Sequence, residues 1–109
     1  FQVGDLDDLT AGKQHFDTVL MSGALNFATT ASPDDRSNSL FATVLQKLRP
    51  QGNFAVNFLS TEVDFENPIN QHYNPESTLR IAKSNSCAVA DLRKGYGLYE
   101  FTIFGKKTR

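Results

Sequence analysis

The stretch SPDDRSNSLFATVLQKLRPQGNFAVNFL, residues 32–59, contains the signals that decide the fold. Ser32 is a favourable N-cap, Pro33 suits the first helical position, and two aspartates follow in the first turn. Apolar residues then recur with the period of a helix and form one stripe: Leu40, Phe41, Val44, Leu45 and Leu48. The stretch therefore predicts an amphipathic helix that begins after Ser32.

The same stretch predicts a turn and a buried strand after the helix. Arg49 suits the negative end of the helix, and Pro50-Gln51-Gly52 is typical of a stop and a change of direction. In residues 54–59 both alternating sets of side chains are largely apolar, which is typical of a strand buried on both faces. A helix followed by a strand is half of a βαβ crossover.

Two strands are predicted before this helix. Phe1–Asp5 alternates with period 2 and leads into an acidic turn at residues 5–8, and a loop is expected at residues 11–14. Phe16–Met21 (FDTVLM) is a nearly continuous apolar run, so we expect a second strand buried on both faces. It ends at Ser22-Gly23, where the chain can change direction at low steric cost.

The C-terminal half predicts a loop, a short helix and a hairpin. Residues 61–74 form a long polar loop, and Asn74-Pro75-Glu76 opens a helix that ends near Ser84. Strands at residues 87–93 and 98–104 are joined by Lys94-Gly95-Tyr96-Gly97, an antiparallel connection, and a basic tail follows. The fold class is α/β, with a mixed sheet and an antiparallel C-terminal hairpin.

Composition limits the classes of protein to consider. The chain has 109 residues, enough for one domain, and 11 Lys+Arg against 12 Asp+Glu give a net charge of −1, which favours neither nucleic acid nor an anionic membrane. One cysteine, Cys87, with only His15 and His72, makes no internal disulfide and no sulfur-rich zinc site. We expect a soluble, cytoplasmic domain without a metal. Because the chain begins with Phe1 in a predicted strand, the sequence reads as part of a longer protein.

Four landmarks in order resemble the C-terminal half of a class I S-adenosylmethionine (SAM)-dependent methyltransferase. They are Gly4-Asp5-Leu6 after the first strand, FDTVL running into SGALN at residues 16–26, LQKLRPQGNF at residues 45–54, and the closing hairpin with LYEFTI at residues 98–103. Tyr73-Asn74-Pro75 and the LYEFTI ending are similar to a subgroup of small bacterial methyltransferases. The resemblance implies a partial Rossmann-like methyltransferase sheet with helices packed on it.

The sequence also departs from that family. The resemblance calls for a first strand with a glycine-rich loop and for an acidic residue after the second strand, and none of these is present. Gly95-Tyr96-Gly97 is no substitute, because no helix follows it. We therefore expect SAM binding by this chain to be weak or absent. The family order also leaves Phe16–Met21 as an exposed apolar edge, which we expect to pair with a second copy, with a missing half-domain, or with the first strand.

The resemblance implies cofactor contacts at Asp5, Leu6, Ser22 and Gly23. The Asp5 carboxylate would accept a hydrogen bond from the adenine amino group, and the Leu6 backbone N–H would face the ring. Ser22, Gly23 and Asn26 would lie beside the transferred methyl group, with Asn26 orienting the acceptor. The alternatives are an ordinary acidic turn at Asp5 and a loop chosen for backbone freedom at Ser22.

Further candidates follow the third strand and the long loop. Asn57 and Ser60 are expected either to make core hydrogen bonds or to contact substrate at the carboxyl end of the sheet. His72 and Tyr73 lie in the loop expected to close over substrate, and His72 is the better candidate for a general base. A solvated loop histidine is the alternative. Methyl transfer to a nucleophilic acceptor needs little beyond alignment, so no base is required.

Two functions follow as hypotheses. The first is a fragment of a methyltransferase that acts on a small-molecule acceptor by direct transfer, the isolated chain being inactive. The second is a non-catalytic module of the same ancestry, with the Phe16–Met21 edge as a dimerisation or partner-binding surface. A strand plus Gly-x-Gly upstream of Phe1 in the natural reading frame would favour the enzyme. A different α/β ligand-binding fold is a third alternative, disfavoured by the closing hairpin.

Overall fold

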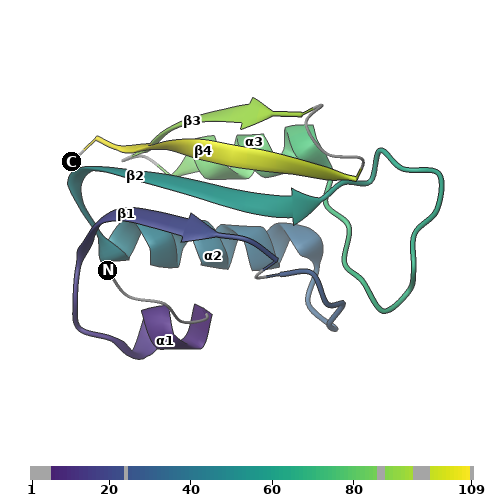
Figure 1. Ribbon diagram of the computed structural model, residues 1–109, viewed down its shortest axis with the longest axis horizontal. Helices are drawn as coiled ribbons and strands as arrows, with labels where there is room; N and C mark the ends of the chain where they lie inside the picture. Colours follow the sequence, from purple (N-terminus) through teal and green to yellow (C-terminus); the bar gives the residue numbers. More distant parts are fainter. Residues whose placement is uncertain (1–5, 24, 86–87, 95–98, 109) are drawn as a thin grey trace.

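The computed structural model describes residues 6–23, 25–85, 88–94 and 99–108 (Figure 1). These residues form the following elements in chain order: α1 (Leu6–Ala11), β1 (Phe16–Met21), α2 (Pro33–Lys47), β2 (Leu48–Leu59), α3 (Pro75–Ser84), β3 (Ala88–Arg93) and β4 (Glu100–Lys107). The strands make one sheet in the order β1-β2-β4-β3, in which β1 is parallel to β2 and the other pairs are antiparallel. The predicted α/β class with a mixed sheet is confirmed.

The two predicted helices begin where their capping residues stand. The Asp35 N–H donates to Ser32 Oγ at 3.1 Å, and the Ser77 N–H donates to Asn74 Oδ1 at 2.9 Å. Each cap satisfies one of the amide groups that the first turn of a helix leaves without a partner. Within the described ranges, no helix is both long enough and apolar enough to cross a membrane.

The turn predicted at residues 50–52 is wrong, because β2 begins at Leu48 directly after α2. Phe16 pairs with Leu48 but Thr18 pairs with Asn53, so the residues between them on β2 form a bulge. Gln51 has a φ of 70°, and a Cβ on Gly52 would lie 2.9 Å from the carbonyl oxygen of Asp17. A bulge accommodates the proline and the glycine that a regular central strand would exclude.

The acidic turn predicted at residues 5–8 is also wrong, because Leu6–Ala11 is the helix α1. Asp8 falls in its first turn, where a carboxylate interacts favourably with the helix dipole. The Gly12 N–H donates to Asp8 O at 3.1 Å, and Lys47 of α2 donates to the carbonyl oxygen of Gly12. The helix is thereby tied to the end of α2.

At the C-terminus, Lys106 and Lys107 belong to β4 and are not a tail as predicted. The strand predicted at Phe1–Asp5, Cys87 and the hairpin connection at residues 95–98 lie outside the described residues.

The strands predicted to be buried on both faces are covered on one face only. α2 and α3 pack against each other and against the same face of the sheet (Figure 1). On β2 the side chains of Phe54, Val56 and Phe58 are buried, whereas the alternating residues between them are half-buried. In β1 only Val19 is buried, and Leu20 is 76% exposed on the opposite face. The prediction assumed helices on both faces, and the described residues supply them on one.

An aromatic cluster forms the centre of the covered face. Phe58 of β2 stacks on Phe101 of β4 with ring centroids 5.4 Å apart, and it contacts Phe41 of α2 at 6.0 Å and Tyr73 at 5.0 Å. Phe41 also meets Phe54 edge-on at 5.9 Å. The ring of Phe58 therefore connects β2 with α2, with the neighbouring strand β4 and with the loop that follows β2.

Phe58→Ala should lower the free energy of unfolding by about 3–5 kcal/mol, because it removes a fully buried ring that touches three other aromatic rings. Urea unfolding followed by circular dichroism measures this loss. Phe65→Ala is the matched control, since Phe65 is 77% exposed and its loss should change stability by less than about 0.5 kcal/mol. Equal effects of the two substitutions would contradict the assignment of the core.

Candidate functional site

The parallel pairing of β1 and β2 brings two loop segments to one edge of the sheet. β1 ends at Met21 and β2 at Leu59, so their carboxyl ends meet at the edge where open α/β sheets place ligands. We call residues 22–23 and 25–31 the post-β1 segment and residues 60–74 the post-β2 segment. These two segments hold most of the described candidate residues: Ser22, Gly23, Asn26, Ser60, His72 and Tyr73.

Backbone hydrogen bonds join the two segments. The Gln71 N–H donates to Asn26 O at 2.8 Å, and the Ala28 N–H donates to Ile69 O at 2.9 Å. The end of the post-β2 segment then returns to its own strand, with the Tyr73 N–H donating to Leu59 O at 2.7 Å. Asn26 and the pair His72–Tyr73, far apart in sequence, are therefore held in one layer of paired backbone.

Tyr73 anchors this layer to the core. Its side chain is 1% exposed, its ring lies against Phe58, and its hydroxyl donates to Leu25 O at 3.1 Å. Burial raises the pKa of Tyr73 above its ordinary value, while the positive charge of Arg36 opposes the rise. The phenol is thus protonated at neutral pH and remains a hydrogen-bond donor.

His72 is buried, at 8% exposure, so the interpretation as a solvated loop histidine is wrong. Its Nδ1 lies 2.8 Å from the carbonyl oxygen of Ser60. A carbonyl oxygen can only accept, so Nδ1 carries the proton in this contact, and in this tautomer Nε2 is the acceptor. The imidazole is held in one tautomer by the end of β2.

The residues expected to contact SAM are only partly described. Asp5 lies outside the described residues, and Leu6 is the first residue of α1. Ser22 is exposed directly after β1. Gly23 has a φ of 72°, a backbone conformation that residues with a side chain rarely adopt. A Cβ on Gly23 would lie 3.2 Å from Nδ2 of Asn26. The backbone turn that places Asn26 therefore favours glycine at this position.

Asn57 lies on the face of the sheet away from the helices. Its Nδ2 donates to Glu100 Oε2 at 3.3 Å, a side-chain contact between β2 and β4. Together with Ser22 and Thr102 it lines a shallow hollow of about 200 Å³. Asn57 thus makes a hydrogen bond on the face away from the helices and not in the core as expected, and a role in contacting substrate stays a prediction.

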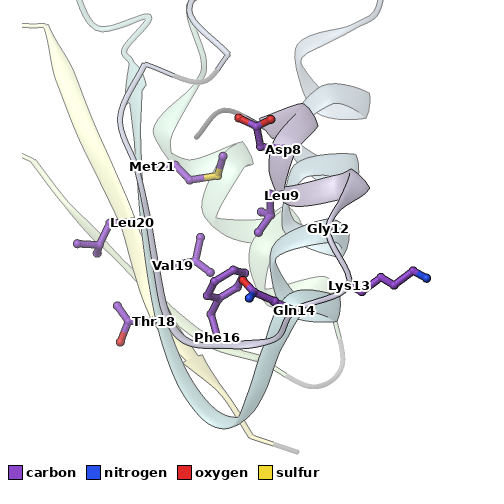
Figure 2. A pocket seen from close by; sticks show the side chains of 10 residues that line it. All are labelled: Asp8, Leu9, Gly12, Lys13, Gln14, Phe16, Thr18, Val19, Leu20 and Met21. Carbon is purple, nitrogen blue, oxygen red and sulfur yellow. The ribbon is translucent and has the colours of Figure 1, made fainter. Parts of the chain in front are cut away.

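A larger groove, of about 370 Å³, runs between α1 and β1 (Figure 2). Figure 2 shows Leu9 of α1 facing Phe16, Val19 and Met21 of β1 across this groove, while Leu20 points to the other side of the strand. Its lining ends at Met21, next to Ser22, and does not include Asn26, His72 or Tyr73. Within the part of the chain that the structure describes, no group of three His, Cys, Asp or Glu side chains could hold a metal.

Sequence reasoning missed Arg36. Its Nη1 donates to Phe27 O at 2.7 Å, so a residue from the first turns of α2 holds the post-β1 segment. Its position one helical turn before Leu40, next to the apolar stripe, was the available signal. A cation at this position of α2 lies close to the post-β1 segment, which follows the adjacent edge of the sheet.

No protein-family model matches the chain, and no curated protein matches it. Solved structures do match. Human N-acetylserotonin methyltransferase in complex with SAM is similar over 100% of this chain, with a TM-score of 0.67 and 15% identity. A "possible exported protein" from Bordetella parapertussis matches 92% of the chain, with a TM-score of 0.68 and 16% identity. Magnesium protoporphyrin IX methyltransferase from Synechocystis PCC 6803, with bound SAM, matches 91%, with a TM-score of 0.59 and 12% identity.

The chain thus has the fold of SAM-dependent methyltransferases, as the resemblance implied. It spans 34%, 41% and 42% of the lengths of these three structures, so it corresponds to less than half of each. At these identities the likeness establishes the fold.

Lys94, Glu62 and Glu76 form an exposed ion-pair cluster at the base of the post-β2 segment, and loss of Lys94 should change the pKa of Glu76 measurably. Lys94 Nζ lies 3.0 Å from Glu62 and 3.0 Å from Glu76, and its hydrogen bond holds the pKa of Glu76 below its ordinary value. Lys94→Met should raise that pKa, which a pH titration of the side-chain carboxyl carbon by NMR measures. The pairing lowers the pKa of Glu76 in the folded state. Its contribution to the free energy of unfolding is therefore present above the unfolded-state pKa of Glu76, and it is lost as the pH falls through the folded-state pKa. Lys106→Met is the control, and an unchanged Glu76 pKa in K94M would contradict the pairing.

Proposed function

We infer that this chain contributes the second half of a SAM-dependent methyltransferase domain, which transfers a methyl group directly to a small-molecule acceptor. The observation that carries the proposal is the paired backbone layer at the carboxyl ends of β1 and β2, in a sheet with the methyltransferase fold. A net charge of −1 favours a small acceptor over nucleic acid. Cytoplasmic location is part of the proposal, and fractionation of cells expressing the natural gene would test it.

In this proposal Asp5, Leu6, Ser22 and Gly23 form one side of a cofactor site. The exposed Ser22 hydroxyl and the left-handed backbone of Gly23 lie at the carboxyl end of β1, and Asp5 and Leu6 are the proposed adenine contacts. When bound, SAM supplies an electrophilic methyl group on a positively charged sulfur. Since these groups would cover only part of such a ligand, we expect binding by the isolated chain to be weak or absent and the isolated chain to be inactive.

In this proposal the chain's own residues align the acceptor. Asn26 orients an acceptor hydroxyl or amine through its side-chain amide. His72, with its proton on Nδ1, offers Nε2 as a proton acceptor for acceptors that must lose a proton. Tyr73 holds this layer of paired backbone against the core. Direct displacement needs the nucleophile and the methyl group in line and water excluded, so orientation is the main contribution of these residues.

A two-dimensional amide NMR titration of the 109-residue chain with S-adenosylhomocysteine tests the cofactor surface. We expect a dispersed spectrum in which amides near Ser22 and Asn26 shift slightly, with a Kd weaker than about 1 mM. A Kd in the micromolar range would show that the chain holds a sufficient cofactor surface by itself and would overturn the proposed incompleteness. The same titration on the product of the whole natural reading frame should give a Kd below about 100 µM, and its failure to bind would overturn the enzyme function.

The alternative function is a non-catalytic module that associates through β1. It is favoured by the position of β1 at the edge of the described sheet, by the 76% exposure of Leu20 and by the groove beside the strand. The partner could be a second copy or a missing half-domain, and the Phe1–Asp5 segment could compete for the same edge.

Leu20→Lys should weaken self-association through β1, because a lysine on an edge strand opposes strand-to-strand pairing. Sedimentation equilibrium over a range of concentrations should show a dimer constant weakened by at least about tenfold, equivalent to roughly 1.4 kcal/mol. Val89→Lys is the matched control: Val89 is 62% exposed on β3, at the other edge of the described sheet. A chain that is monomeric at all concentrations would contradict self-association through β1.

A further inference from the structure

Three consecutive carbonyl oxygens of the post-β1 segment are each held by a different part of the molecule. Leu25 O accepts from the Tyr73 hydroxyl at 3.1 Å, Asn26 O accepts from the Gln71 N–H at 2.8 Å, and Phe27 O accepts from Arg36 Nη1 at 2.7 Å. The segment is neither helix nor sheet apart from a single bridge between Phe27 and Asn70. Its backbone path therefore depends on these donors.

Of the three donors, the Tyr73 hydroxyl is the one whose position is set by the core. The ring is 1% exposed and lies 5.0 Å from Phe58, and the backbone of Tyr73 is fixed to the end of β2 by bonds to Leu59 O and from the Thr61 N–H. Arg36, by contrast, reaches the segment with a long side chain that is only half-buried. A rigid phenol loses little conformational freedom when it makes its bond, so it suits the task of fixing a loop.

We propose that Tyr73 is a positioning residue, which acts through the Leu25 carbonyl to hold the post-β1 and post-β2 segments together as one unit. Asn26 follows Leu25 directly and Gly23 lies two residues before it, so in this proposal the hydroxyl determines where their backbone lies without touching a ligand. The Gln71 and Ala28 amides bond across the two segments, so we expect them to be protected from solvent exchange only while the segments stay together. That these residues face a cofactor and an acceptor rests on the proposed function, whereas the coupling of the segments does not.

Tyr73→Phe tests the coupling, because it removes the hydroxyl and keeps the ring against Phe58. Native-state hydrogen exchange of the full chain, without any ligand, should show Ala28 and Gln71 exchanging about tenfold faster, the size expected for loss of one buried hydrogen bond. Amides of Val56 and Ile103, in the centre of the sheet, should exchange at unchanged rates. Tyr99→Phe is the matched control, since Tyr99 is 55% exposed, and it should leave both pairs unchanged.

Arg36→Met gives a second route to the same unit. It should also speed exchange at Ala28 and Gln71, and in combination with Y73F the two effects should fall short of additive, because both variants open the same unit. Equal acceleration at Val56 and Ile103 in Y73F would show a loss of global stability and overturn the positioning role. Unchanged exchange at Ala28 and Gln71 in both variants would overturn it too.

Titration with S-adenosylhomocysteine separates this inference from the proposed function. In the product of the whole reading frame, Y73F should weaken the Kd by about five- to tenfold while Y99F leaves it unchanged. Faster exchange at Ala28 and Gln71 without any S-adenosylhomocysteine binding would uphold the coupling and overturn the function. Tight binding with unchanged exchange would do the reverse.

Discussion

The packing of Phe58 is the contact on which the rest of this structure depends. β2 is the strand that pairs with both β1 and β4, and Phe58 is the point where it meets α2, β4 and the post-β2 segment. Burial of aromatic surface is the largest contribution that single side chains make to a small core, and geometric pairing of rings adds to it. A chain of 109 residues with helices on one face of its described sheet has few other places from which to obtain that stability.

This packing also links stability to the site, through Tyr73. The ring belongs to the aromatic cluster, and the hydroxyl belongs to the layer of paired backbone at the carboxyl ends of β1 and β2. The layer contains little regular secondary structure, so its order comes from the side chains and the backbone bonds that hold it. A disturbance of the cluster around Phe58 would therefore reach Leu25 and Asn26 through a single rigid side chain, without passing through any other element.

Local signals predicted most of the elements, with α1 as an exception, and they predicted the surroundings of those elements poorly. Neighbouring residues determine several of the features that were predicted. These are the caps at Ser32 and Asn74, the apolar run at Phe16–Met21 and the closing hairpin. The extension of β2 through Pro50 and Gly52 could not, because a bulge exists only relative to the partner strand. Burial on both faces failed for the same kind of reason, since apolar composition does not state which face a helix will cover.

The candidate site was predictable as a set of segments and not as a set of contacts. Residues that follow parallel strands meet at one edge by topology, which is why Asn26, His72 and Tyr73 could be expected together. The Nδ1 tautomer of His72 and the contact between Arg36 and Phe27 depend on side-chain directions that no sequence pattern encodes.

The direction of β1 adds one more constraint. A strand added parallel to β1 brings its carboxyl end beside Ser22, whereas a second copy related by a twofold axis perpendicular to the sheet is antiparallel and brings its amino end there. Under the proposed function only the first arrangement would extend the edge where open sheets bind ligands, so antiparallel self-pairing through β1 would compete with completion of the proposed cofactor site.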